Sequence, residues 1–223
     1  MNAALRQQLF FKLQRLIGSD AESAYNEFLA VERMDSSRYQ ELTHDRLTSV
    51  LRHALNNVPY YRDSAKVRNE IDLGHFPVVT KSELRDHFPD FLTSEVAAQH
   101  AGGAKAGSGY SWTEVQTGGT TGIPTTVIHD REFRDRGRAS RMYSQYLCGF
   151  PFGVPYFRLW GSMVDINNVR DSIQQRVMKR LSREILLNVF RMEDSDVNRY
   201  IELVNSSEIH HMIDIRIFHA KRI

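Results

Sequence analysis

A short segment rich in glycine and threonine is the part of this sequence whose residue types could do chemistry. It holds three glycines and four threonines within residues 117–125. Glycines let backbone N–H groups converge on a ligand through φ/ψ values that other residues avoid. Converging amides form a nest for phosphate oxygens, and threonine hydroxyls add donors. The sequence therefore predicts an anion-wrapping loop with these binding residues: Thr117, Gly118, Gly119, Thr120, Thr121 and Gly122.

Other catalytic motifs are missing, and the alternative for this segment is a plain Gly/Thr-rich hairpin turn. Neither G-x-x-x-x-G-K-[ST] nor G-x-G-x-x-G occurs, which excludes a Walker A loop and a Rossmann fingerprint. No G-x-S-x-G elbow or evident nucleophile is present, so no catalytic residue is assigned. His210 and His211 lack a histidine at i+4 or a carboxylate at ligand spacing, and we expect no protein metal site.

Composition and charge point to a globular protein of a reducing compartment. The formal net charge of +2 over 223 residues gives no argument for a nucleic-acid or membrane partner. The one cysteine, Cys148, cannot form an internal disulfide. No run of 18 apolar residues exists, and Lys12 and Arg15 interrupt the apolar residues where a signal peptide needs an unbroken core. We expect a cytoplasmic protein without a membrane span.

The elements expected to position the loop are two strands and a helix. Residues 112–116 and 125–129 have strand character, which predicts a strand-loop-strand hairpin. Asp130 is then expected to cap a helix running to about residue 147. Four arginines lie on one face of that helix, and although they could hold phosphates or a nucleic acid, interleaved acidic residues favour a solvated face. They are Arg131, Arg134, Arg138 and Arg141.

The region before the hairpin is expected to be mainly helical. Apolar spacing predicts helices over residues 5–17, 21–31 and 36–58, with Ser36 or Ser37 as the cap of the third. The first should dock on the rest of the protein through Leu5, Leu9, Leu13, Leu16 and Ile17, rather than lie on a membrane. We expect Pro59 to end the third helix and the tyrosines after it to be packing residues. Thr80 and Glu83 form a predicted capping box.

The later part of the chain alternates strands and helices. Strands are predicted at 156–160, 185–189 and from 209 onward, with helices at 169–181 and 194–204. This alternation is α/β in character. A glycine-rich loop at 100–111 separates the two regions, so the predicted domains are a mainly helical region over 1–110 and an α/β portion over 111–223.

Several stretches resemble adenylate-forming enzymes of the phenylacetate–coenzyme A ligase type, in the branch associated with capsular polysaccharide biosynthesis. They follow the family's order from about residue 40 to residue 205. Besides 117–125, they are Leu51–Ala54, Asn57–Arg62, Phe76–Arg85, Trp160–Ser162 and Leu187–Met192.

The resemblance implies a fold, a reaction and cofactors. Such a ligase joins a small carboxylate to ATP, giving an acyl-adenylate and pyrophosphate, and usually passes the acyl group to a thiol such as coenzyme A. The loop matching 117–125 holds the β- and γ-phosphates, and Mg²⁺ accompanies the nucleotide. Preorganised amides suit this step because the pyrophosphate gathers charge as it leaves. The acyl pocket is apolar, and Tyr156, Phe157 and Trp160 are either its lining or plain core.

The sequence also departs from the family pattern. Ile123 stands where family loops often carry a lysine, and the resemblance is lost after about Ser206. Family members are about twice as long, so we expect an incomplete N-terminal domain, as a frameshift or premature stop would produce, whose unfinished sheet edges favour self-association. The alternative is a non-catalytic nucleotide-binding or assembly module derived from the family.

Overall fold

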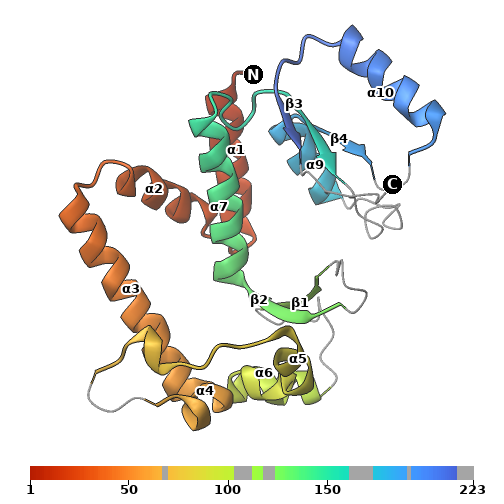
Figure 1. The fold of residues 1–223 in the computed structure, drawn as a ribbon. Coiled ribbons are helices and arrows are strands. Elements are labelled where there is room, and N and C mark those ends of the chain that lie inside the picture. The colour runs from red at the N-terminus through yellow and green to blue at the C-terminus, as the bar shows by residue number, and fades with distance from the viewer. Residues whose placement is uncertain (67–69, 103–111, 118–123, 161–172, 190–191, 215–223) are drawn as a thin grey trace, which may run out of the picture. The chain divides into compact units, whose positions relative to one another are not determined.

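The structure is a computed structural model that describes residues 1–66, 70–102, 112–117, 124–160, 173–189 and 192–214 (Figure 1). It is a mixture of helices and small sheets, compatible with the predicted α/β class. The chain forms two compact units. The first unit contains residues 1–25 and 138–223, and the second unit contains residues 26–137. The predicted domain boundary near residue 110 stays a prediction.

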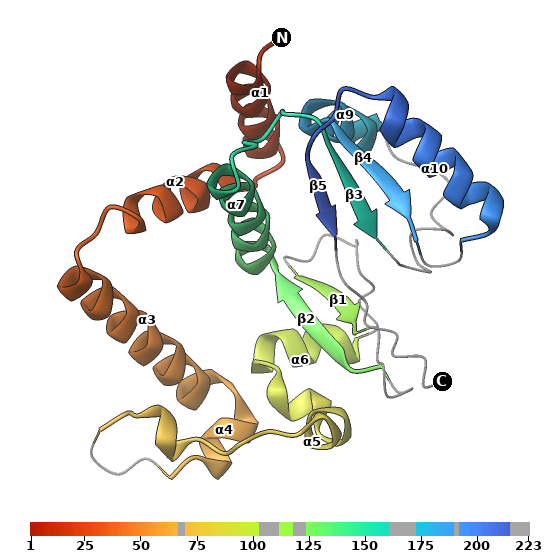
Figure 2. The same cartoon turned by 45° about the horizontal axis from the view of Figure 1, so that its top comes forward.

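The first unit is built on a parallel sheet. Strands β3 (Tyr156–Trp160), β4 (Glu184–Asn188) and β5 (Met212–Asp214) run in the same direction in the order β4-β3-β5 (Figure 2). Phe157, at the centre of the sheet, pairs with Ile185 on one side and Met212 on the other, and its side chain is 1% exposed. The sheet therefore supplies the core of this unit.

Helices connect these strands, as parallel strands require. They are α9 (Ile173–Ser182) between β3 and β4, and α10 (Asp194–Ser206) between β4 and β5. The predicted strand and helix alternation is thus confirmed for the described residues. The start of the predicted helix at 169 and the end of the last predicted strand lie outside the described residues.

Helix α1 (Ala3–Leu16) docks on the first unit, but through a different face from the predicted one. It packs against α9 and buries Phe10, Phe11 and Gln14, whereas Leu5 and Leu16 are 51% and 82% exposed. The expected leucine face was wrong because larger aromatic rings decide the packing. The ring centroids of Phe10 and Phe152 are 4.5 Å apart, and those of Phe11 and Tyr25 are 5.8 Å apart.

Helix α7 (Arg131–Leu147) follows the hairpin and continues into the first unit from Arg138 onward. Both views show it beside α1 (Figure 1, Figure 2). Its N-cap is the predicted Asp130, whose Oδ1 accepts a hydrogen bond from the Phe133 N–H at 2.7 Å. Ala139 and Met142 are buried along it. The predicted cap and helix are confirmed.

The second unit contains the middle helices. Helix α2 (Ala21–Val31) leads into it, and α3 (Ser36–Asn57) is capped by Asp35, whose Oδ1 accepts from the Arg38 N–H at 2.8 Å. The prediction of Ser36 or Ser37 as the cap was wrong, because the aspartate reaches the same backbone donors from one position earlier. Pro59 does end α3, but it also begins the unpredicted short helix α4 (Pro59–Ser64), since proline suits a first helical position.

Short helical segments complete the second unit. These are the 3-10 helices η1 (Leu73–His75) and η2 (Phe88–Phe91) and the helices α5 (Lys81–Asp86) and α6 (Ser94–Ala101). The predicted capping box of Thr80 and Glu83 is confirmed at the start of α5. The aromatic rings of Tyr60 and Phe91 stack at 4.0 Å, which confirms that the tyrosines after Pro59 are packing residues.

None of the helices in the described part of the chain is both apolar enough and long enough to cross a lipid bilayer.

Candidate functional site

The candidate phosphate loop lies on a β-hairpin. Strands β1 (Trp112–Gln116) and β2 (Thr126–Asp130) pair antiparallel, with Val115 opposite Val127 and Gln116 opposite Thr126. The predicted strand-loop-strand setting is therefore confirmed, with β2 beginning one residue later than expected. Both strands belong to the second unit.

Two hydrogen bonds close the loop at its base. The Thr117 N–H donates to the Thr125 carbonyl at 2.9 Å, and the Thr125 N–H donates to the Thr117 Oγ1 at 3.1 Å. The two ends of the loop, Thr117 and Thr125, are thus held together by the hairpin. Thr117 is the predicted binding residue that the structure describes. The others lie outside the described residues: Gly118, Gly119, Thr120, Thr121 and Gly122.

Thr125 places a polar atom at the base of this loop. Its side chain is 3% exposed, and within the described residues its Oγ1 has no hydrogen-bond partner. A buried hydroxyl without a partner costs about 1–3 kcal/mol. An acceptor delivered here by the loop or by a ligand would therefore be stabilised. Sequence reasoning placed Thr125 in the loop but did not single it out.

A solvent-open hollow of about 310 Å³, which we call the hairpin hollow, lies beside the base of the loop. Pro124 and Thr126 come from the returning arm of the loop, and Glu114 comes from β1. The helical segments around α5 and α6 supply the other lining residues, Leu84, Arg85, Phe88 and His100. The lining of the hollow therefore combines residues at the base of the predicted phosphate loop with residues that sequence reasoning did not assign to the site.

The ionisable side chains of the hairpin hollow are an arginine, a histidine and a glutamate. The His100 Nε2 lies 3.5 Å from the Glu114 Oε2. The His100 ring packs between Phe88 and Trp112, at centroid distances of 5.5 and 6.3 Å. The Trp112 Nε1 donates to the Gln99 Oε1 at 2.6 Å, which fixes the indole. The imidazole is thus held against Glu114, while Arg85 adds a cationic side chain to the lining.

A sequence signal existed for only one of these side chains. Arg85 ends a stretch that resembles the ligase family, whereas His100 opens a small-residue segment without a period or motif. Glu114 alternates with its neighbours like any strand residue. Their proximity depends on how α5, α6 and the hairpin pack.

Two arginines of the predicted stripe contact other elements of their own unit. The Arg134 Nη1 donates to the Thr113 Oγ1 at 2.9 Å, which ties α7 to the hairpin. The Arg138 Nη1 donates to the Ser19 Oγ at 3.4 Å. Arg134 therefore helps to position the hairpin, whereas the contact of Arg138 lies within the first unit.

Among the described residues, no three His, Cys, Asp or Glu side chains gather in a way that could hold a metal ion. The groups suited to an anion are instead the closed loop, the Thr125 hydroxyl and Arg85.

Comparison with known proteins points to a class of ligases. Phenylacetate-coenzyme A ligase of Escherichia coli (strain K12) is 37% identical over 105 residues, which are 44% of this chain and 22% of the enzyme. Phenylacetate-coenzyme A ligase of Aromatoleum evansii is 31% identical over 109 residues, 44% of this chain and 21% of the enzyme. No protein-family model and no solved structure matches the chain.

These similarities support the ligase resemblance over part of the chain. The chain covers about a fifth of the length of the relatives that it matches. Part of this protein is thus similar to phenylacetate-coenzyme A ligases.

Proposed function

We propose that this chain carries the phosphate-binding part of an ATP-dependent, carboxylate-activating ligase of the adenylate-forming type. In this proposal the loop 117–125 binds the β- and γ-phosphates of ATP. The similarity to phenylacetate-coenzyme A ligases supports the reaction class. The observation that supports the loop assignment is its closure by hydrogen bonds between Thr117 and Thr125 at the end of a β-hairpin.

The chemistry of the loop suits a polyphosphate. Backbone amides around Gly118, Gly119 and Gly122, with the hydroxyls of Thr120 and Thr121, would donate to the phosphate oxygens. The Thr117 N–H is used in closing the loop, so Thr117 acts at the base. Mg²⁺ bound with the nucleotide would neutralise phosphate charge.

The hairpin hollow would contribute electrostatics next to the loop. Arg85 attracts negative charge, and His100 engages the Glu114 carboxylate, which would otherwise repel a phosphate. Both effects favour an anion without direct contact.

Finer assignments are part of the same proposal. Coenzyme A is the proposed acyl acceptor, a small-molecule carboxylate the substrate, and the cytoplasm the compartment. A link to capsular or other polysaccharide biosynthesis is proposed from the resemblance of the stretches between about residues 40 and 205.

The test is calorimetric titration of the purified 223-residue chain with Mg²⁺ and ATP, pyrophosphate or AMP. Pyrophosphate should compete with ATP, and AMP should bind at least about tenfold more weakly, because hydrogen bonds to charged groups carry most of the affinity. Replacing Thr120 and Thr121 by valine should lower ATP affinity about tenfold. Thr43→Val on α3 is the matched control, since the Thr43 hydroxyl donates to the Tyr39 carbonyl and has no role in the loop.

Equal affinity for AMP and ATP, an unchanged affinity of the double variant, or no ATP binding would each refute the assignment. Carboxylate-dependent ATP–pyrophosphate exchange then separates the two functional classes. Turnover identifies an adenylating activity in this chain, whereas ATP binding without exchange identifies a nucleotide-binding module.

A further inference from the structure

Helix α1 has a second apolar face, opposite to the one that docks. Leu5, Leu9 and Leu16 are 51%, 39% and 82% exposed, and we call them the leucine face. At about 100° per residue they fall within about 40° of one another, whereas the buried Gln14 lies about 160° from their centre. Apolar spacing had assigned these leucines to docking. The structure leaves them in contact with solvent.

Helix α9 packs beside α1 and borders the leucine face. The Arg6 Nη1 donates to the Arg180 carbonyl at 2.9 Å, and the Gln14 Nε2 donates to the Met178 Sδ at 3.4 Å. Arg6 lies on α1 between Gln14 and the leucine face, about 80° from each. The last turn of α9, which Arg6 contacts, therefore lies next to the leucine face.

These two helices carry cations and no carboxylate. Four exposed cations on them or directly after them pair with no carboxylate among the described residues, namely Lys12, Arg176, Arg180 and Arg183. The carboxylates that follow the helices in sequence all have partners: Asp20 and Glu22 after α1, and Glu184 after α9. Lys12 falls about 20° from Leu5 and so belongs to the same side of α1 as the leucine face.

Helix α10, in which acidic side chains are in excess, lies across the sheet from α9. In the strand order β4-β3-β5 the connections from β3 to β4 and from β4 to β5 run in opposite directions. Right-handed crossovers therefore place α9 and α10 on opposite faces of the sheet. Helix α10 contains Asp194, Asp196 and Glu202 against the one cation Arg199. The first unit is thus polarised, although the net charge of the whole chain is only +2.

We propose that the α1–α9 side of the first unit binds the surface of a membrane rich in anionic lipids. The four cations contact lipid phosphates, and the leucine face enters the boundary between headgroups and acyl chains. A nucleic acid or an acidic peptide would match the cations but leave the leucines in water, and an apolar partner would leave the cations unmatched. None of these residues belongs to the hairpin or its loop, so this surface is additional to the proposed ATP site.

The test is co-sedimentation of the full 223-residue chain with vesicles. One set contains phosphatidylglycerol and phosphatidylcholine in equal amounts, and the other contains phosphatidylcholine alone. We expect at least about tenfold tighter binding to the anionic vesicles, weakening as salt screens the cations. Soluble poly-glutamate and duplex DNA, measured by titration, should bind at least about tenfold more weakly than the anionic vesicles, because neither buries leucines.

Two double variants separate the charge from the apolar contact. Arg176→Gln with Arg180→Gln should weaken binding to the anionic vesicles at least about tenfold, since each basic residue near such a surface contributes about fivefold. Leu5→Gln with Leu16→Gln should weaken it about tenfold, at high salt as well as at low salt, because apolar burial is not screened. All four side chains are exposed, so neither variant should unfold the protein, and thermal melting followed by circular dichroism checks this.

Matched controls come from the second unit. Arg33→Gln with Arg52→Gln removes the same charge, and Val50→Gln with Leu73→Gln removes apolar side chains that are 64% and 57% exposed. Neither control should change vesicle binding. The proposal is overturned by absent vesicle binding, by equal binding to neutral and anionic vesicles, or by poly-glutamate or DNA binding as tight as that of anionic vesicles. It is also overturned if either double variant binds no more weakly than its control.

Discussion

Each unit contains a hollow, and the two hollows differ in how widely their lining residues are spread along the sequence. The hairpin hollow is lined by residues 84–126, close in sequence, and the anion binding that we propose next to it comes from backbone amides of the adjacent loop. A second hollow, of about 150 Å³ in the first unit, which we call the helical hollow, is lined by side chains of α1, α7 and α9 and of the first residues of β3 and β4, from Phe10 to Glu184. A site made from backbone leaves a local sequence motif because glycine and threonine must be adjacent. A site made from side chains of distant elements leaves no such motif.

The largest expected effect tests whether the two hollows rest on separate cores. Phe157→Ala removes a fully buried ring at the centre of the first unit's sheet. Its loss should lower the free energy of unfolding of the first unit by about 4 kcal/mol, through lost burial and the cavity left behind. Urea unfolding followed by tryptophan fluorescence measures this, because one tryptophan lies in each unit, Trp160 in the first and Trp112 in the second.

Single-tryptophan backgrounds give each unit its own signal. Trp112→Phe leaves Trp160 as the reporter of the first unit, and Trp160→Phe leaves Trp112 as that of the second. Phe157→Ala should move the Trp160 transition and leave the Trp112 transition in place. Equal movement of both unfolding transitions would show that the two units unfold as one cooperative core. The two hollows would then not rest on separate cores.

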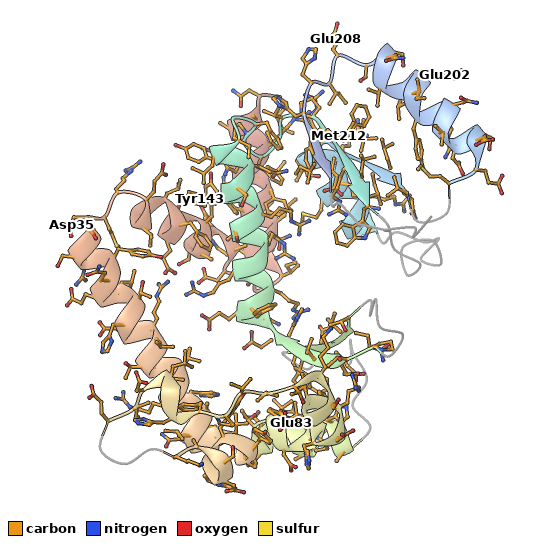
Figure 3. The ribbon with its side chains drawn as sticks, viewed as in Figure 1. Asp35, Glu83, Tyr143, Glu202, Glu208 and Met212 are labelled. Carbon is orange, nitrogen blue, oxygen red and sulfur yellow. The ribbon has the colours of Figure 1, made fainter. Side chains whose placement is uncertain are left out.

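The next effect concerns the buried carboxylate below the helical hollow. Glu184→Ala leaves Arg158 and the Tyr156 hydroxyl without their shared acceptor. Removing one partner of a buried ion pair costs about 3–5 kcal/mol, and because this pair is slightly exposed we expect about 3 kcal/mol in the free energy of unfolding. Glu202→Ala is the control, since Glu202 is exposed on α10 (Figure 3). A loss from Glu184→Ala no larger than the control's would mean that the carboxylate is not needed at the floor of the hollow.

A smaller effect is expected in the hairpin hollow, where the contact between His100 and Glu114 is partly exposed to solvent. The side chains of His100 and Glu114 are 34% and 39% exposed. Glu114→Gln should raise ATP affinity about threefold by removing a like charge near the phosphates, and Arg85→Gln should lower it about threefold. Titration calorimetry at low and high salt measures both, and Glu41→Gln on α3 should change nothing. An ATP affinity that neither Glu114→Gln nor Arg85→Gln changes would argue that the hollow does not sense the nucleotide.

Local patterns sufficed to predict most elements of this fold. The hairpin, the Asp130 cap of α7 and the capping box of α5 were all predicted because each depends on residues only a few positions apart. The docking face of α1 was not predicted correctly. Apolar spacing shows that a helix is amphipathic, but it does not show which side chains its neighbours in the fold will contact. Phe10 and Phe11 are buried instead of the leucines because they pack against the rings of Phe152 and Tyr25.

The predicted binding role of the loop stays a prediction, since residues 118–123 lie outside the described residues. The glycines and threonines of 117–125 indicated an anion loop, but the closure by Thr117 and the buried Thr125 hydroxyl required the pairing of β1 with β2. His100, Glu114 and Arg85 come from three separate elements, and no sequence spacing brings them together. The helical hollow went unpredicted for the same reason, although Arg138 and Arg141 had been noticed as part of a stripe.

The smallest effect concerns the helix that brings Arg85 to the hairpin hollow. Glu83 at the start of α5 (Figure 3) accepts two hydrogen bonds at Oε2, from the Thr80 hydroxyl at 2.7 Å and the Thr80 N–H at 2.8 Å. These bonds hold the pKa of Glu83 below its ordinary value, the hydroxyl having the larger influence. A carboxyl whose pKa is lowered on folding stabilises the native state above its unfolded pKa, and that contribution is lost as the pH falls through the folded pKa.

Thr80→Ala should therefore raise the pKa of Glu83 toward its ordinary value and make α5 less sensitive to acid, an effect visible in a ¹³C-carboxyl NMR titration. Thr93→Ala is the matched control. Thr93 caps α6 in the same way, through the Val96 N–H at 3.4 Å, but with valine rather than glutamate at the third helical position. It should weaken its own helix and leave the pKa of Glu83 unchanged. If both variants shift Glu83 equally, the shift reports the general stability of the second unit, and the capping box does not by itself hold Arg85 in the hairpin hollow.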